Sequence, residues 1–322
     1  MAQSPTPQPA SITHVAEVAL RIKANVEKVL VGKGDVIDLC LAAILSSGHI
    51  LIEDVPGIGK TILARSLADS LSCSFKRIQF TPDLMPSDIT GIHFYNQKSG
   101  EFEFRPGPII AQVVLADEIN RATPRTQSAL LEAMAERQLT VDHETIALPA
   151  PFLVMATQNP VELEGPFPLP EAQLDRFLLR LRLGYPEESE EEEILTRFQF
   201  ADPLSGLQPV ATAQEILEFQ NVVRGVYVDP VLRNYIVQLV QATRNHADVE
   251  LGASPRASLG IYRCSQALAA LQGHDYVSPD DIKRVAPHAL PHRLILKPQA
   301  RLRERTQESV VEQLLDQLPV PV

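Results

Sequence analysis

Cysteine is scarce in this chain of 322 residues, which has only Cys40, Cys73 and Cys264. The three lie far apart in apolar surroundings. An odd, scattered set argues against a disulfide framework and favours a reducing, cytoplasmic compartment. The chain also lacks a cluster of Cys and His residues with the spacing of zinc ligands. We therefore look for neither a disulfide-stapled domain nor a zinc module.

Long apolar runs and an excess of basic residues are missing too. No run approaches the roughly 20 apolar residues that a membrane-spanning helix needs. Residues 1–10 have no basic region and no apolar core, so we expect a disordered Pro-rich leader rather than a signal peptide. The 29 Lys and Arg residues stand against 40 Asp and Glu, a formal net charge of −11. This weighs against a broad nucleic-acid-binding face, although it is compatible with a local basic channel.

What the chain does have is a short apolar run at 49–53 that leads into Asp54-Val55-Pro56-Gly57-Ile58-Gly59-Lys60-Thr61. A segment with helical periodicity follows from Ile62. A strand, a glycine-rich turn and a helix in this order are the context of a phosphate-binding P-loop. The two glycines let backbone N–H groups converge on an anion. Lys60 can then reach the β- and γ-phosphates of a nucleotide, and the Thr61 hydroxyl can bind Mg²⁺.

One position departs from the usual P-loop pattern, because Asp54 stands where the first glycine is expected. The competing interpretation of the whole stretch is a chance glycine turn between a strand and a helix. The polar residues described next favour the P-loop.

Polar side chains end two further apolar segments. Asp117 and Glu118 follow the run that begins at Ala111, and Asn159 follows the run that begins at Phe152. Each run is typical of a buried parallel strand that delivers its last residues to the carboxyl edge of a sheet. There Asp117 can hold Mg²⁺ through its water shell, Glu118 can activate the attacking water, and Asn159 can hydrogen-bond that water or the γ-phosphate. The alternatives are solvated acids at a strand end, and a turn residue before proline.

Arg256 stands in an unusual place for a cation. Ser254 and Pro255 predict a helix start, so Arg256 falls in the first turn, where a positive charge opposes the helix dipole. That cost is easier to understand if the side chain faces an anion such as a nucleotide phosphate. The alternative is an arginine that faces solvent.

The chain changes character near residue 185. Before it we expect helices over 11–30 and 35–46 and from 124, strands over 74–80, 111–118, 152–159 and 177–181, and hairpins over 92–105 and 139–148. After it strands vanish, and we expect helices over 187–200, 212–224, 230–246, 255–271 and 279–289. The fold class is therefore α/β, with a parallel-sheet core over 11–185 and an all-helical lid over 186–322. The acidic run 187–193 is interpreted as a solvated helix start.

Together these motifs resemble the MoxR family of AAA+ ATPases over nearly the whole chain after the leader. The resemblance is carried by the P-loop, 115–122 around Asp117-Glu118, 156–160 around Asn159, 169–177 around Arg176, and 252–256. Asp54 in place of glycine also fits that family. The two hairpins fall where this branch of AAA+ proteins carries its insertions, which face the pore or the partner in rings of this type.

The resemblance implies roles that the residue patterns do not give. It makes Lys60 and Thr61 the Walker A lysine and magnesium ligand, Asp117 and Glu118 the Walker B acids, and Asn159 sensor 1. Arg256 matches sensor 2 on the lid, and Arg176 matches the arginine finger, which acts on the nucleotide of a neighbouring subunit. Val31 and Gly32 match the backbone that borders adenine. The predicted nucleotide contacts are completed by Asp54, Val55, Pro56, Gly57, Ile58, Gly59 and Ile62.

The resulting hypothesis is a Mg²⁺-dependent ATPase that works as a ring, expected to be a hexamer, and remodels or matures partner proteins. The resemblance implies chaperone-like complex assembly or metal-cofactor insertion, with partners that contain a von Willebrand factor A-type domain. Two other classes compete. A nucleic-acid motor of the related insert-bearing branch is disfavoured by the net charge and the lack of a winged-helix or zinc module. An ATP-binding scaffold without turnover is disfavoured by Glu118, Asn159 and Arg176.

Overall fold

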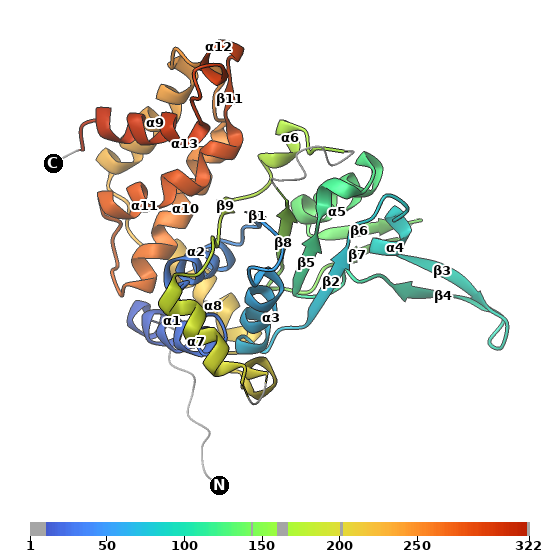
Figure 1. Cartoon of the computed structure of the whole chain (residues 1–322). Coiled ribbons are helices and arrows are strands. Elements are labelled where there is room, and N and C mark those ends of the chain that lie inside the picture. The colour runs from blue at the N-terminus through green and yellow to red at the C-terminus, as the bar shows by residue number, and fades with distance from the viewer. Residues whose placement is uncertain (1–10, 143, 160–166, 200–201, 321–322) are drawn as a thin grey trace, which may run out of the picture.

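A five-stranded parallel sheet lies at the centre of the computed structural model, which describes residues 11–142, 144–159, 167–199 and 202–320 (Figure 1). The predicted leader lies outside the described residues. The strands are β1 (Ile50–Glu53), β2 (Phe75–Gln79), β5 (Val113–Asp117), β8 (Leu153–Gln158) and β9 (Leu179–Leu181). Their order is β2-β5-β8-β1-β9. The strand that delivers Asn159 thus lies between the P-loop strand and the acidic strand, which brings all three motifs to one edge.

Both faces of the sheet are buried, as near-continuous apolar strands require. Alternate residues enter opposite cores: Ile50 and Ile52 join one hydrophobic cluster, and Leu51 joins the other. The first cluster also contains residues of α1 (Ile12–Glu27), α2 (Gly34–Leu45) and α3 (Lys60–Ser70). The second contains residues of α4 (Pro86–Thr90) and α5 (Pro124–Glu136). The predicted helix over 11–30 is confirmed with shorter bounds, and the predicted helix over 35–46 is confirmed one residue earlier.

Two antiparallel hairpins leave the sheet where the sequence predicts them. One is β3 (Gly91–Asn96) with β4 (Glu101–Pro106), and the other is β6 (Gln138–Val141) with β7 (Glu144–Ala147). The β3–β4 hairpin projects away from the body of the molecule (Figure 1). His93 Nδ1 lies 2.9 Å from Asp142 Oδ2, so a polar contact joins the two hairpins.

Helices dominate the chain after residue 185, and three of them begin with a capping residue followed by proline. Asp229, Ser254 and Ser278 each accept a hydrogen bond from a backbone N–H of the first turn. The main helices are α7 (Glu188–Arg197), α8 (Ala213–Arg224), α9 (Pro230–Asn245), α10 (Pro255–Leu271), α11 (Pro279–Ala289) and α13 (Gln307–Gln317). The short ones are α12 (Pro298–Arg301) and the 3₁₀ turns Pro203–Gly206 and Pro291–Arg293, while α6 (Glu171–Leu174) and the 3₁₀ turn Ile119–Arg121 lie before residue 185. All five predicted helices are present, whereas α12 and α13 were not predicted.

One detail of the prediction is wrong, because the helical region contains a small antiparallel sheet of β10 (Val249–Leu251) and β11 (Ile295–Leu296). Strands of three and two residues are too short to show an alternating pattern. The helical region also shares a core with the N-terminal helices, since α1 and α2 pack against α10 in one continuous cluster. Among the described residues, every helix is too short or too polar to cross a bilayer.

Candidate functional site

The glycine-rich turn adopts the conformation that an anion cradle needs. Gly57 and Gly59 have φ angles of +87° and +94°, in the region that side chains disfavour. The space where a Cβ atom of Gly57 would stand has no heavy atom within 4 Å, so the loop is open to a ligand. Gly59 also caps α3, whose N-terminal N–H groups and dipole favour negative charge.

Lys60 is poised beside this turn. Its Nζ donates to the Asp54 carbonyl oxygen at 2.7 Å. Partial burial lowers the pKa of Lys60, and the nearby carboxylates of Asp117, Asp54 and Glu118 act in the opposite direction. The ammonium group therefore stands in a negatively charged surrounding and has a short path to an incoming phosphate.

The unusual Asp54 has a structural use. Its Oδ2 accepts hydrogen bonds from the backbone N–H groups of Leu183 and Gly184, at 2.6 and 2.9 Å, and its Oδ1 accepts from Val55 N at 3.2 Å. The carboxylate thus joins the start of the P-loop to the segment that leaves β9. A glycine at this position could not make that connection. Contact of Asp54 with nucleotide stays a prediction.

An apolar pocket of about 230 Å³ lies next to the P-loop. Val31, Ile58 and Ile62 line one side, and Ile194 of α7 and Phe198, which caps the end of α7, line another. Gly57 and Gly59 also border it, so a flat base could enter with its phosphates on the loop. Gly32 does not line the pocket. It has a φ of +71° and lies against the Glu190 carboxylate, which leaves no space for a Cβ atom there.

The two acids that end β5 are both held by neighbouring side chains. Asp117 Oδ1 accepts from the Thr157 hydroxyl at 2.6 Å, and Asp117 Oδ2 accepts from Arg77 Nη2 at 2.6 Å and from Nε at 3.1 Å. Glu118 has a φ of +58°, which turns it away from the strand. Its Oε2 accepts from Gln79 Nε2 at 2.6 Å and lies 3.1 Å from Arg121 Nη1.

Asn159 is buried at the end of β8, where it borders a polar pocket of about 520 Å³ between the sheet edge and the helical region. Thr157 precedes it by two residues, so both side chains leave the strand on the same side. Thr157 also accepts the Glu118 N–H at 2.8 Å, which fixes the backbone between the two acids. The P-loop, the acids and Asn159 are therefore brought together.

The oxygen ligands at this edge suit a magnesium–nucleotide complex. Thr61 lies in the first turn of α3, and Asp117 ends the strand two places along the sheet. Among the residues described, no three His, Cys, Asp or Glu side chains gather as a metal site. Mg²⁺ bound with ATP does not need such a group, because it takes one or two protein oxygens together with phosphates and waters. The residues present fit this cofactor pair.

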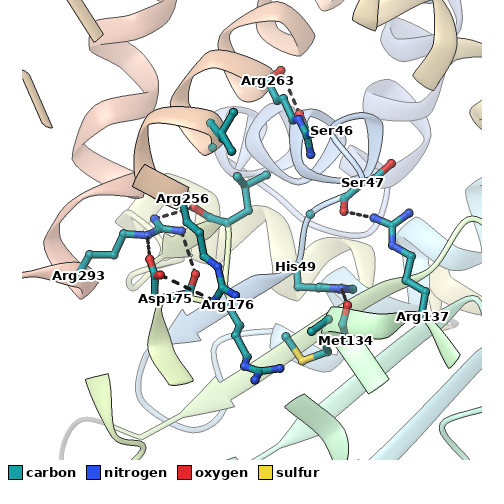
Figure 2. A pocket seen from close by; sticks show the side chains of 15 residues that line it. Ser46, Ser47, His49, Met134, Arg137, Asp175, Arg176, Arg256, Arg263 and Arg293 are labelled. Atoms are coloured by element: carbon teal, nitrogen blue, oxygen red, sulfur yellow. Dashed lines mark hydrogen bonds and ion pairs between the residues drawn. The ribbon is translucent and has the colours of Figure 1, made fainter. Parts of the chain in front are cut away.

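Arg176 and Arg256 lie elsewhere. They line a pocket of about 300 Å³, here called the arginine pocket, whose charged residues are Arg137, Asp175, Arg176, Arg256, Arg263 and Arg293 (Figure 2). Ser46 to His49, just before β1, form another wall. The pocket is therefore at the amino end of β1, whereas the P-loop is at its carboxyl end. Four strand residues separate the two edges by roughly 13 Å.

Neither arginine faces phosphate-binding groups of its own chain. Arg176 Nη1 donates to the Leu131 carbonyl oxygen at 2.7 Å. Arg256 is exposed, and its Nη1 lies 3.9 Å from Asp175 Oδ2. Ser254 Oγ caps α10, as predicted, and donates to the same carboxylate at 2.9 Å.

Arg293 fixes one side of the pocket. It is almost completely buried, and its Nε donates to Asp175 Oδ1 at 2.8 Å. Its other nitrogens donate to backbone carbonyls before β9, including Phe177 O at 2.6 Å. Burial lowers the Arg293 pKa, and Asp175 opposes that effect. This ion pair ties the helical region to the sheet and so positions Arg256 relative to Arg176.

Sequence reasoning missed Arg77, Gln79, Thr157 and Arg293. Thr157 had a signal, since it is a polar residue in an otherwise apolar strand. Arg77 and Gln79 alternate on the predicted strand at 74–80, but their role depends on the pairing of β2 with β5. Arg293 had no local signal, because its partner Asp175 is 118 residues away.

Comparison with known proteins agrees with this geometry. Residues 49–179 match the model of the ATPase family associated with various cellular activities (AAA), and residues 241–314 match the AAA lid domain. The chain is 41% identical over 321 residues to the protein named Chaperone MoxR1 of Mycobacterium tuberculosis strain H37Rv, covering 97% of this chain and 84% of that one. It belongs to the MoxR family of AAA+ ATPases. The family prediction made from the motifs is thereby confirmed.

Two further proteins match over similar lengths. Identity is 52% over 298 residues to the uncharacterized protein YeaC of Bacillus subtilis strain 168, covering 92% of this chain and 93% of that one. The crystal structure of a putative ATPase from Cytophaga hutchinsonii superposes with a TM-score of 0.91 at 39% identity, covering 97% of both chains. The arrangement of sheet and helical lid is thus shared with a solved relative.

Proposed function

We propose that this MoxR-family chain hydrolyses ATP with Mg²⁺ in a ring, a hexamer by expectation, and uses the reaction to remodel partner proteins. One observation carries the proposal. The P-loop, the carboxylates of Asp117 and Glu118, and an apolar pocket sized for a base all meet at the carboxyl edge of one sheet. An edge of this kind is where α/β proteins bind nucleotides.

The chain's own residues would divide the chemistry as follows. Lys60 and the N–H groups after Gly57 bind the phosphates, while Thr61 and Asp117 hold the metal. Mg²⁺ supplies charge neutralisation on the β- and γ-phosphates. Glu118 accepts the proton of the attacking water once it leaves Gln79 and Arg121, and Asn159 orients that water. The hydrogen bonds from Arg77 to Asp117 Oδ2 must also break, so that this oxygen can bind the water shell of the metal.

The positions of Arg176 and Arg256 support a site shared between subunits. Both lie at the amino edge of the sheet, roughly 13 Å from the carboxyl edge that holds the P-loop of the same chain. Their charges can neutralise a transferring phosphoryl group only if a second subunit presents its P-loop to the arginine pocket. The proposal therefore gives both arginines to the nucleotide of the adjacent subunit.

A remodelling role is supported by the β3–β4 hairpin. Tyr95 and Phe102 are 54% and 73% exposed on it, and Ile92 is also exposed. An apolar hairpin that projects from the body suits transient contact with a client protein. The name of the relative Chaperone MoxR1 is in keeping with this role. We propose clients with a von Willebrand factor A-type domain, in complex assembly or metal-cofactor insertion, and a cytoplasmic location in keeping with three free, buried cysteines.

The test mixes two inactive variants. Arg176→Ala removes the predicted finger and Glu118→Gln removes the predicted base, so each ring alone should lose at least about 100-fold in phosphate release. Mixed rings contain junctions in which an intact Glu118 meets an intact Arg176, and these should recover part of the rate. Lys60→Ala serves as the control that loses binding of a fluorescent ATP analogue. If mixed assemblies verified by size-exclusion chromatography recover nothing, the finger is another residue.

A further inference from the structure

The arginine pocket carries more positive charge than the proposed reaction uses. Arg293 is neutralised by Asp175, the only carboxylate among the described residues that line the pocket. Arg176 and Arg256 are assigned above to the neighbour's phosphates. This leaves Arg137 and Arg263, in a protein whose net charge is −11.

Arg137 and Arg263 have no carboxylate within ion-pair distance among the described residues. Arg137, at the end of α5, donates from Nη2 to the Ser47 carbonyl oxygen, and Figure 2 shows it across the pocket from Arg256. Partial burial and the positive charges of Arg224 and Arg263 lower the Arg137 pKa. The cations therefore repel one another, and an anion brought into the pocket would relieve that repulsion.

An apolar spot accompanies these charges. Leu259 lines the arginine pocket and is 55% exposed. It stands on α10 between Arg256 and Arg263, three residues after one and four before the other, so the three side chains share one helix face. The face thus offers a leucine between two arginines.

Helix α7 has exposed carboxylates and an exposed leucine, which complement the arginines and the leucine of the arginine pocket. Glu190 and Glu193 are already paired with Lys33 and Arg197, whereas the exposed side chains of Glu188, Glu191 and Glu192 have no ion-pair partner among the described residues. Leu195 follows them on the same helix and is 71% exposed. This face thus offers a leucine beside free carboxylates.

The position of α7 links this face to the nucleotide. Ile194 and Phe198 line the apolar pocket beside the P-loop, so α7 flanks the proposed nucleotide site. A subunit that presents Arg176 and Arg256 to that nucleotide must bring its arginine pocket close to α7. The α7 of the same chain does not line that pocket.

We propose that Arg137 and Arg263 bind the free carboxylates of α7 on the adjacent subunit, with Leu259 against Leu195. The inference rests on the shared site proposed above and names the second copy as the partner. The contact joins two different surfaces head to tail, as a ring requires. It holds the neighbour's nucleotide site against Arg176 and Arg256 without contacting the phosphates.

Charge reversal tests the contact. Arg137→Glu with Arg263→Glu, or Glu191→Arg with Glu192→Arg, places like charges across the interface, and each pair should raise the concentration needed for assembly at least about 10-fold. A chain that carries all four substitutions restores opposite charges at every junction and should regain assembly and ATPase activity. Sedimentation velocity in the presence of ATP measures the concentration needed for assembly, and phosphate release measures the ATPase activity. Assembly of the unaltered chain should also weaken as salt rises.

Matched controls separate this contact from general charge effects. Arg233 and Glu312 are exposed, outside both surfaces and without an ion pair among the described residues, so Arg233→Glu and Glu312→Arg should change nothing. The neutral variant Arg263→Gln should also weaken assembly, but by less than the charge reversal of Arg137 and Arg263. The contact is refuted if the reversals leave assembly unchanged, or if the fourfold variant is no better than its worse parent. Full activity of Arg176→Ala would instead refute the shared site itself.

Discussion

The two acids proposed for catalysis, Asp117 and Glu118, are restrained by side chains of a neighbouring strand. Arg77 and Gln79 extend from β2 toward the end of β5, where they hold Asp117 and Glu118 respectively. The hydrogen bond from Gln79 stabilises the charged form of the Glu118 carboxylate and so makes it a weaker acceptor for a water proton. If Glu118 is the base of the proposed reaction, we expect its contact with Gln79 to slow hydrolysis until some movement separates the two side chains.

Gln79→Leu should raise the rate of ATP hydrolysis in the absence of a client. The substitution removes the donor to Glu118 and keeps the side-chain volume, so the carboxylate is freed. A hydrogen bond to a charged group contributes about 1.5–3 kcal/mol, and its loss should increase basal phosphate release by roughly tenfold. Gln214, which donates to Glu218 on α8 far from the site, is the matched control. If Gln79→Leu hydrolyses ATP no faster than the unaltered chain, and Gln214→Leu is also unchanged, the hydrogen bond from Gln79 to Glu118 does not limit the rate of hydrolysis.

At the residue scale, local patterns predicted the parts of the site that are local. Lys60, Thr61, Asp117 and Glu118 are each defined by a few neighbouring residues with a strand before them. The restraints on those residues depend on which strands pair, and the sequence of β2 says only that it is a strand. Gly32 shows the same limit, because the space beside its Cα atom is filled by the side chain of Glu190, which is distant in the sequence.

At the element scale, the P-loop is joined to the start of the helical region through Asp54. Its carboxylate accepts the N–H groups of Leu183 and Gly184, four residues before α7 begins. Since α7 forms part of the apolar pocket, we expect a movement of the P-loop to be transmitted to that pocket.

Asp54→Gly should therefore raise the KM for ATP several-fold and leave kcat nearly unchanged. Glycine is the usual residue of a P-loop here, so the loop should still form. The amides of Leu183 and Gly184 lose their acceptor, which should lower the free energy of unfolding by about 1–3 kcal/mol. Steady-state kinetics and urea denaturation measure the two effects. Asp54→Asn keeps one acceptor oxygen, so its KM and its free energy of unfolding should lie between those of Asp54→Gly and of the unaltered chain. An unaltered KM in Asp54→Gly would mean that the link between Asp54 and the segment before α7 has no part in ATP binding.

Element prediction succeeded where periodicity extends over a full turn or strand. The helices α10 and α11 begin at a capping serine and a proline, and their predicted and observed bounds agree. The strands β10 and β11 were missed because pairing over two or three residues is decided by tertiary contacts. The same reasoning explains why the contacts that join the helical region to the sheet, such as Arg293 with Asp175, were not predicted.

At the scale of the whole molecule, stability should depend on buried imidazoles. Burial lowers the pKa of His49 to about 4, and burial also lowers the pKa values of His288 and His292. His49 Nδ1 accepts the Val154 N–H at 3.0 Å, a role that only the neutral ring can fill. The unfolded chain binds more protons than the folded chain between pH 6.5 and 4, so folding is favoured above that range.

The free energy of unfolding should consequently be constant near pH 7 to 8 and fall as the pH drops from 6.5 toward 4. His49 alone should account for about 3 kcal/mol of that decrease, from a pKa difference of about 2.5 between the two states. Urea denaturation at a series of pH values gives the slope. His49→Asn should show a shallower decrease over this range, and an identical slope would assign the effect to other groups.

The separation of the P-loop from Arg176 by the width of the sheet has a genetic consequence. If the ATPase sites are shared as proposed, each chain contributes residues to two sites and contains neither site in full. A chain that lacks both Lys60 and Arg176 then silences the junction on each side of it, so in random mixtures the activity falls with the square of the wild-type share. Such an allele would be dominant when expressed beside the normal one.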